Sequence, residues 1–384
     1  MFPPRRRTCS AMLERTRQII DMNRGIPPIG AIPTAALSAI TARLVSERAE
    51  LFQYAPIGGY LGDPLLRRQI ADRLGEIDAD EIFIGSGSLQ VLDLIAATLL
   101  DKGPRPVLVE APTYDRAIGI FTRRGADIHP VPIDSNGINV DRVESLVSRH
   151  PGAVLYLIPD FQNPSGATLS MERRHHLARV AQTHGLTIVE DIPYRELRYR
   201  GQALPLLRRL APDQVITLGS FSKTLSPGLR IGYAVCGADL AGALARCAEN
   251  IYLSPSPLCQ AVAAAAMAEG LVERNIVHAV QLLGPRCQAA VAVAKQLFGG
   301  ELLAEPQGGY FLSLNLSTTA SETAVLEAAR HAGLILARGS AFMPWDEIRG
   351  GKTFLRLPFQ GLDPEEFSEG MARLRRILDE QSAI

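Results

Sequence analysis

The feature of this 384-residue chain that most constrains its fold is a regular alternation of apolar runs and amphipathic segments between residues 64 and 236. Runs such as 106–110, 153–158 and 215–219 are almost continuously apolar, which is typical of strands covered on both faces. Segments with helical spacing, such as 89–100 and 171–184, separate them. This order predicts an α/β domain built on a mainly parallel sheet of seven strands.

The pattern changes after about residue 238. Residues 240–267 are rich in alanine and predict two helices divided at 254–257. Further strands are expected at 309–314 and 354–359, and these mixed elements predict a second, smaller α+β domain. We therefore expect three units, which are an N-terminal segment (1–50) joining the small domain, a large domain (51–270) and a small C-terminal domain (271–384).

Composition excludes several classes of partner. The 40 basic and 40 acidic residues leave no net charge, which argues against nucleic acid or an anionic membrane as a partner. No stretch approaches 18 apolar residues, and the basic start lacks the apolar run of a signal peptide, so a cytoplasmic location is expected. The five cysteines are odd in number and form no C-x-x-C pair, which favours neither a disulfide framework nor a metal site.

Lysine is rare in this chain. Only four of the 40 Lys and Arg residues are lysines: Lys102, Lys223, Lys295 and Lys352. Lys223 follows an apolar strand, and three serines and Arg230 lie close to it in sequence. An amine in this setting suits Schiff-base chemistry with a phosphorylated aldehyde, because hydroxyls and an arginine can bind the phosphate. The alternative is an ordinary surface loop.

A glycine-rich turn at 85–90 joins a strand to a helix and predicts a phosphate site, because helix N-termini bind anions. With Glu110 further along, it also resembles a dinucleotide fingerprint, although Gln90 replaces the third glycine. A turn with no ligand remains an alternative. Asn163 and the segment 190–194 follow two other strands, and ligands of α/β sheets bind at such strand ends.

Together these motifs resemble the pyridoxal 5′-phosphate (PLP) aminotransferases of fold type I, class I/II, in particular the 2-aminoadipate aminotransferases and the aminotransferase half of MocR-type regulators. A regulator is disfavoured, because about 50 residues before the first motif cannot hold a winged helix and a linker. The resemblance rests on Tyr54, Leu66-Arg67, 87–90, 110–114, 162–166, 190–194, 220–223, 227–233, 308–311 and 355–357.

The resemblance implies a catalytic set. Lys223 would form the Schiff base and carry the proton between Cα and C4′. Asp191 would keep the pyridine nitrogen protonated, and Asn163 and Tyr194 would hydrogen-bond the ring oxygen O3′. Arg356 would bind the substrate α-carboxylate through two hydrogen bonds in a bidentate pair, beside Asn163.

The resemblance also implies the remaining cofactor contacts. Tyr114 would stack on the ring. Tyr54 would reach the phosphate of a neighbouring subunit, which implies a homodimer with shared sites. The phosphate would be held by the backbone of Ser88 and Leu89 and by Ser220, Ser222 and Arg230.

The expected function is therefore PLP-dependent transfer of an amino group between an L-amino acid and a 2-oxo acid. Three alternatives stay open: another PLP reaction on an amino acid (elimination, decarboxylation, cyclisation or oxidation), a nicotinamide-linked oxidoreductase, and a PLP-binding sensor. Arg15 or Arg24 could pair with an acidic substrate side chain, and the extra residues at 58–64 would line the entrance.

Overall fold

The large sheet is built from strands buried on both faces. In the computed structural model, which describes residues 19–55, 60–75, 77–101, 103–345 and 350–382, the strand order is β2-β9-β8-β7-β6-β3-β4-β5. From β8 to β4 neighbouring strands are parallel, while β9 is antiparallel to β2 and β8. The bounds are β2 Ile82–Gly85, β3 Pro106–Ala111, β4 Asp127–Asp134, β6 Val154–Leu157, β7 Thr187–Asp191, β8 Val215–Ser220 and β9 Gly232–Val235.

The expected α/β fold with a mainly parallel sheet is confirmed, with one correction to the strand count. The sheet has an eighth strand, β5 (Gly137–Ile138), which turns back antiparallel on β4. Two residues are too short to stand out as an apolar run, which is why the sequence did not predict this strand. The apolar runs 106–110, 153–158 and 215–219 correspond to β3, β6 and β8, whose ends lie within one residue of these bounds.

Helices cover both faces of the sheet because successive side chains of each strand point to opposite sides. Val107 and Val109 pack in the core beneath α3, α4 and α8, whereas Leu108 packs beneath α5, α6 and α7. The bounds are α2 Pro64–Leu74, α3 Ser88–Leu99, α4 Asp115–Arg123, α5 Val140–Val147, α6 Met171–His184, α7 Leu207–Leu210, α8 Ala238–Tyr252 and α9 Pro257–Ala268.

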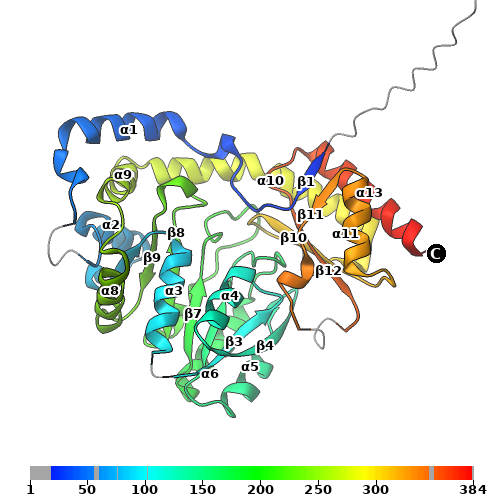
Figure 1. Cartoon of the computed structure of the whole chain (residues 1–384), viewed down its shortest axis with the longest axis horizontal. Helices are drawn as coiled ribbons and strands as arrows, with labels where there is room; N and C mark the ends of the chain where they lie inside the picture. Colours follow the sequence, from blue (N-terminus) through cyan, green and yellow to red (C-terminus); the bar gives the residue numbers. More distant parts are fainter. Residues whose placement is uncertain (1–18, 56–59, 76, 102, 346–349, 383–384) are drawn as a thin grey trace, which may run out of the picture.

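The C-terminal part has a separate core around β10 and β12, which pair antiparallel. The N-terminal strand β1 pairs in parallel with β11 of this part, while the helix α1 contacts α9. The N-terminal segment thus touches both halves (Figure 1). The bounds are β1 Ile20–Met22, α1 Thr34–Glu47, β10 Phe311–Leu316, α11 Glu322–His331, β11 Leu334–Leu336, β12 Thr353–Pro358 and α13 Pro364–Ser382.

The helix α10 (Leu271–Phe298) joins the two halves (Figure 1). Its 28 residues contact α9 near one end and α13 further along, so it contributes to both cores. By length and mean hydropathy it passes as a candidate membrane span, although polar residues interrupt it and it contains no run of 18 apolar residues. However, its buried side chains recur every three or four residues and pack on neighbouring elements, as in the core helix of a globular protein.

Candidate active site

The turn between β2 and α3 presents backbone N–H groups at a helix N-terminus. Gly87 has φ 91° and precedes α3 without a side-chain cap, so the N–H groups of Ser88 and Leu89 remain available to an anion. A Cβ atom on Gly87 would lie 2.2 Å from Nη2 of Arg230, so glycine allows this guanidinium to rest on the turn. Gly232 similarly admits the backbone of Ser88.

Lys223 lies just beyond β8, and its amine is buried in the site. Its Nζ donates to the carbonyl oxygen of Gly25 at 3.1 Å and lies 5.4 Å from the ring centre of Tyr310. Burial, together with the charges of Arg230 and Arg356, lowers the pKa of Lys223 to about 8. This amine can therefore lose its proton near neutral pH, which an attack on a carbonyl carbon requires. The adjacent turn is closed by Ser220 Oγ, which accepts from the N–H of Ser222 at 3.1 Å.

Asp191 ends β7 and has one carboxylate oxygen without a partner. Oδ2 accepts from the hydroxyl of Tyr156 at 2.8 Å, while the buried Oδ1 has no hydrogen bond. Burial raises the pKa of Asp191 to about 7. A buried oxygen of this kind calls for a donor, and a cationic N–H group would satisfy it best.

Arg356 in β12 is a buried arginine that makes no ion pair within the part of the chain that the structure describes. Its Nη1 donates to Asn163 Oδ1 at 3.2 Å and its Nη2 to the carbonyl of Asn23 at 2.6 Å. The rings of Phe311 and Phe342 lie 4.8 and 4.4 Å from its guanidinium carbon. Its Nε is buried and has no acceptor among the described residues, so the guanidinium keeps hydrogen-bonding capacity for an anionic partner.

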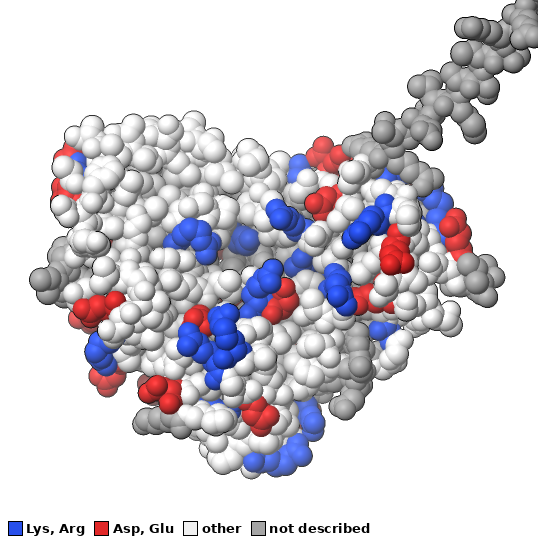
Figure 2. Space-filling view, viewed as in Figure 1, with Lys and Arg blue, Asp and Glu red and all other residues white. Residues whose placement is uncertain are grey.

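The structure brings most of the predicted residues together but leaves one apart. Tyr194 is buried against the rings of Tyr310 and Phe311, at 5.4 and 5.7 Å. Tyr114 precedes α4, and burial followed by the charges of Asp115 and Asp191 raises its pKa to about 12. Tyr54 is 80% exposed in the single chain. Figure 2 shows a hollow on this face of the molecule with Lys and Arg side chains at its edge.

Some predicted features fall outside the described residues. Arg15 and part of the loop 58–64 lie outside the described residues. Arg24 is described, and its side chain is exposed. The described end of that loop leads into α2, where Asp63 accepts from the N–H of Leu66 at 2.8 Å. These observations assign neither feature to the site.

Sequence reasoning missed two contributors to the site, Tyr156 and Gly25. Tyr156 carries the one hydroxyl of the buried strand β6, and a buried hydroxyl needs a partner, so a signal was present. Gly25 gave no signal, because its role depends on a backbone carbonyl and on a close approach. A Cβ atom at Gly25 would lie 2.2 Å from Cζ of Phe311.

The comparisons with known proteins agree with this geometry. The family profile described as aminotransferase class I and II matches residues 17–374. The chain belongs to this family. A 2-aminoadipate transaminase of Thermus thermophilus is 33% identical over 97% of this chain and 93% of its own length.

Further comparisons support the same assignment. The crystal structure of the α-aminoadipate aminotransferase from Thermus thermophilus, complexed with N-(5′-phosphopyridoxyl)-L-leucine, superposes with a TM-score of 0.86 at 32% identity, covering 95% of this chain and 93% of that one. The probable regulatory protein MocR of Rhizobium meliloti is 28% identical over 93% of this chain and 72% of its own length. This chain is therefore a PLP-dependent aminotransferase, which transfers an amino group between an amino acid and a 2-oxo acid.

The nicotinamide alternative is wrong, and the structure shows what its two signature residues do. Gln90 folds back so that its Oε1 accepts from the N–H of Ser86 at 2.9 Å. Glu110 is buried and accepts from the N–H of Ile158 at 2.9 Å and from Nε2 of Gln162 at 3.1 Å. Both side chains support loops of the aminotransferase site, and Glu110 is not free to bind a ribose.

The residues of this aminotransferase fit PLP by three observations. The unpartnered oxygen of Asp191 suits a protonated ring nitrogen. The turn at Gly87, with Arg230 above it, suits a phosphate. The amine of Lys223 suits an aldehyde.

We expect the cofactor-free protein to lose stability as the pH rises from about 5 to about 8. Burial raises the pKa of Asp191 to about 7 and that of Glu110 to about 8. Each group keeps its proton in the folded protein up to the raised pKa. The free energy of unfolding is therefore highest below the ordinary pKa of the carboxyl and decreases as the pH rises through the raised pKa. The slope approaches about 1.4 kcal/mol per pH unit for each group while it titrates. Thermal unfolding across this range measures it.

Two comparisons isolate the Asp191 part of this effect. Asp191→Asn should flatten the slope of the cofactor-free protein, because the amide does not titrate. Loading with PLP should also flatten it, because a cation beside Asp191 lowers the pKa of that carboxyl. An identical pH dependence in all three forms would contradict the assignment of the slope to Asp191.

Proposed function

We propose that Lys223 and Asp191 carry the amino-group transfer of this enzyme. Bound PLP supplies an aldehyde for the covalent link and a ring that accepts electrons from the substrate Cα. Lys223 makes the link and moves the proton between Cα and C4′, while Asp191 holds the proton on the ring nitrogen. The observation that carries this proposal is the buried, unpartnered oxygen of Asp191 at the end of β7, together with a lysine of lowered pKa just beyond the neighbouring parallel strand β8.

Binding of the substrate is assigned to Arg356 and Asn163. A buried guanidinium without an ion pair within the described residues is suited to a carboxylate, which would share it with the amide of Asn163. Asn163 and Tyr194 would also hydrogen-bond the ring oxygen, and Tyr114 would stack on the ring. The phosphate contacts are assigned to the backbone of Ser88 and Leu89 and to Ser220, Ser222 and Arg230.

We further propose a homodimer with shared sites in the cytoplasm. Tyr54, at 80% exposure, is available to a second subunit, and Phe52 beside it is 64% exposed. Apolar side chains exposed in one region favour a protein interface. For the location, the support is that the four described cysteines are all free, as expected in a reducing compartment.

The experiment that tests the proposal is a half-reaction followed by visible absorption. The purified PLP-loaded enzyme is mixed with single L-amino acids and no acceptor. An amino acid that bleaches the yellow band and releases one equivalent of its 2-oxo acid identifies the donor. Release of ammonia, carbon dioxide or another product would instead assign a different PLP reaction. A band that no amino acid alters would favour a PLP-binding sensor.

Gly25→Ala is expected to raise KM for the amino acid about tenfold, which corresponds to about 1.4 kcal/mol. The added methyl group meets the ring of Phe311 and displaces the carbonyls of Asn23 and Gly25 from Arg356 and Lys223. Gly30→Ala is the matched control, because its Cβ atom would meet only Leu282 at an ordinary 3.8 Å. Equal KM values in both variants would contradict the role of Gly25.

A further inference from the structure

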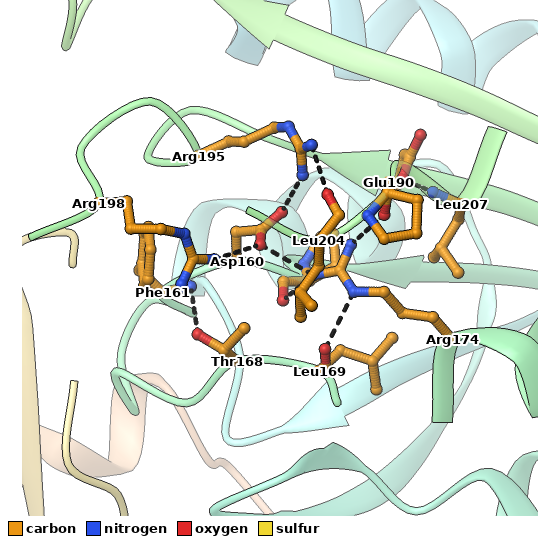
Figure 3. Close-up of polar contacts among 12 residues, drawn as sticks. Asp160, Phe161, Thr168, Leu169, Arg174, Glu190, Arg195, Arg198, Leu204 and Leu207 are labelled. Carbon is orange, nitrogen blue, oxygen red and sulfur yellow. Dashed lines mark hydrogen bonds and ion pairs between the residues drawn. The ribbon is translucent and has the colours of Figure 1, made fainter. Parts of the chain in front are cut away.

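A buried carboxylate, Asp160, is surrounded by three guanidinium groups. Arg174 Nη2 lies 2.8 Å from Oδ1, Arg195 Nη1 lies 3.0 Å from Oδ2 and Arg198 Nη2 lies 3.4 Å from Oδ1. Figure 3 shows all three side chains pointing toward Asp160. The side chains of Asp160 and Arg174 are fully buried, so desolvating these charges is costly and the cluster gains little as an isolated ion pair. Its significance lies in the segments that it joins.

The first of these segments is the loop that carries Asn163. Asp160 itself lies three residues before Asn163. Arg174, from α6, donates to the carbonyls of Pro159 at 2.9 Å and Leu169 at 3.0 Å, which lie at the two ends of the loop. The cluster therefore fixes the base of the loop from which Asn163 reaches Arg356.

The second segment leads to Phe311. Arg198 binds Asp160 with one nitrogen and Gln307 Oε1 with the other, at 3.1 Å. Backbone hydrogen bonds continue this connection, from Tyr199 N–H to the carbonyl of Gln307 at 2.8 Å and from Gly309 N–H to the carbonyl of Leu197 at 2.9 Å. Phe311 follows two residues later.

Both segments meet at Arg356. Its guanidinium donates to Asn163 on one side and lies on the ring of Phe311 on another. Lys223 and Asp191, by contrast, stand at the ends of β8 and β7 and make no hydrogen bond to the cluster. The cluster is thus connected to the guanidinium by two routes, through Phe311 and through Asn163, of which Asn163 is also assigned to the ring oxygen; neither route includes Lys223 or Asp191.

We propose that Asp160 is a positioning residue for the substrate carboxylate, acting through Arg174 and Arg198 on the two neighbours of Arg356. This inference rests on the proposed role of Arg356. It predicts that weakening the branch through Arg198, which leads to Phe311 and not to Asn163, impairs substrate binding while the bound cofactor and the chemical step change little.

The test is Arg198→Met in the PLP-loaded enzyme, because this side chain is at the edge of the cluster and 13% exposed. We expect KM for the donor amino acid to rise about three- to tenfold, within the range of such indirect couplings. We expect kcat and the visible spectrum to stay close to those of the parent enzyme. Arg173→Met is the matched control, since Arg173 lies on α6 but pairs with Asp134 at 2.7 Å.

Two further variants keep the test decisive if a buried charge proves necessary for folding. Gln307→Ala cuts the same connection without altering a charge and should raise KM in the same direction. In a double-mutant cycle, Asp160→Asn and Arg198→Met should give non-additive effects on KM, because they break one shared contact.

The outcomes separate this inference from the proposed function. If the parent enzyme fails to bleach with any amino acid, the proposed function fails. If the parent bleaches but Arg198→Met and Gln307→Ala keep its KM, the positioning role is wrong. A fall in kcat with an altered spectrum and unchanged KM would likewise overturn it, since the cluster would then act on the cofactor.

Discussion

Lys223→Ala is expected to abolish the yellow absorption of the PLP-loaded enzyme and to lower turnover by at least about 10³-fold. Lys223 is the buried amine of the site, and alanine can neither form the covalent link nor carry a proton. Absorption spectra and the half-reaction with the donor amino acid measure the two losses separately.

Two variants accompany this experiment. Lys223→Arg should be equally inactive, because a guanidinium keeps its positive charge but does not release its proton. Lys295→Ala is the control, since Lys295 is 56% exposed and pairs with Glu305 on the surface. Turnover that survives in the alanine variant would show that another group performs the proton transfer.

Asp191→Asn should lower kcat by about 10²- to 10³-fold while PLP still binds. The carboxylate is replaced by a group of the same shape, so Tyr156 keeps a partner. The amide has no charge, however, and no longer favours a protonated ring nitrogen at the position of the unpartnered oxygen.

Tyr156→Phe distinguishes the effect of the Asp191 charge from the effect of the hydrogen bond that orients this carboxylate. It removes only the 2.8 Å hydrogen bond to Oδ2, and we expect a loss of about tenfold, typical of a hydrogen bond to a charged group. If both variants lose activity equally, Asp191 acts chiefly through its orientation by Tyr156. A normal kcat in Asp191→Asn would contradict the role of the carboxylate.

The fold of the large sheet could be predicted because its strands are apolar on both faces and its turns contain glycine and proline. The same argument gave no prediction for α10, where Gly284 and Pro285 interrupt a helix that tertiary contacts maintain on both sides. It also failed for β5, whose two residues have no pattern of their own.

The site was predictable where a residue type is chemically required. Lys223 was identified from the rarity of lysine and from its setting, and Asp191 from its place at a strand end. Gly25 and the Asp160 cluster were not predictable, because their contacts join residues far apart in the chain. Arg174 from α6 and the two arginines of the segment after β7, Arg195 and Arg198, converge on Asp160 only in the folded molecule.

The pairing of β1 with β11 has a mechanical consequence. The segment that follows β1 supplies the carbonyls bound by Lys223 and Arg356, and its start is hydrogen-bonded to the half of the molecule that carries Arg356. A rotation of that half against the large sheet would move the segment and Arg356 together, away from Lys223. Uncovering the reactive amine and withdrawing the carboxylate-binding guanidinium would then be one movement.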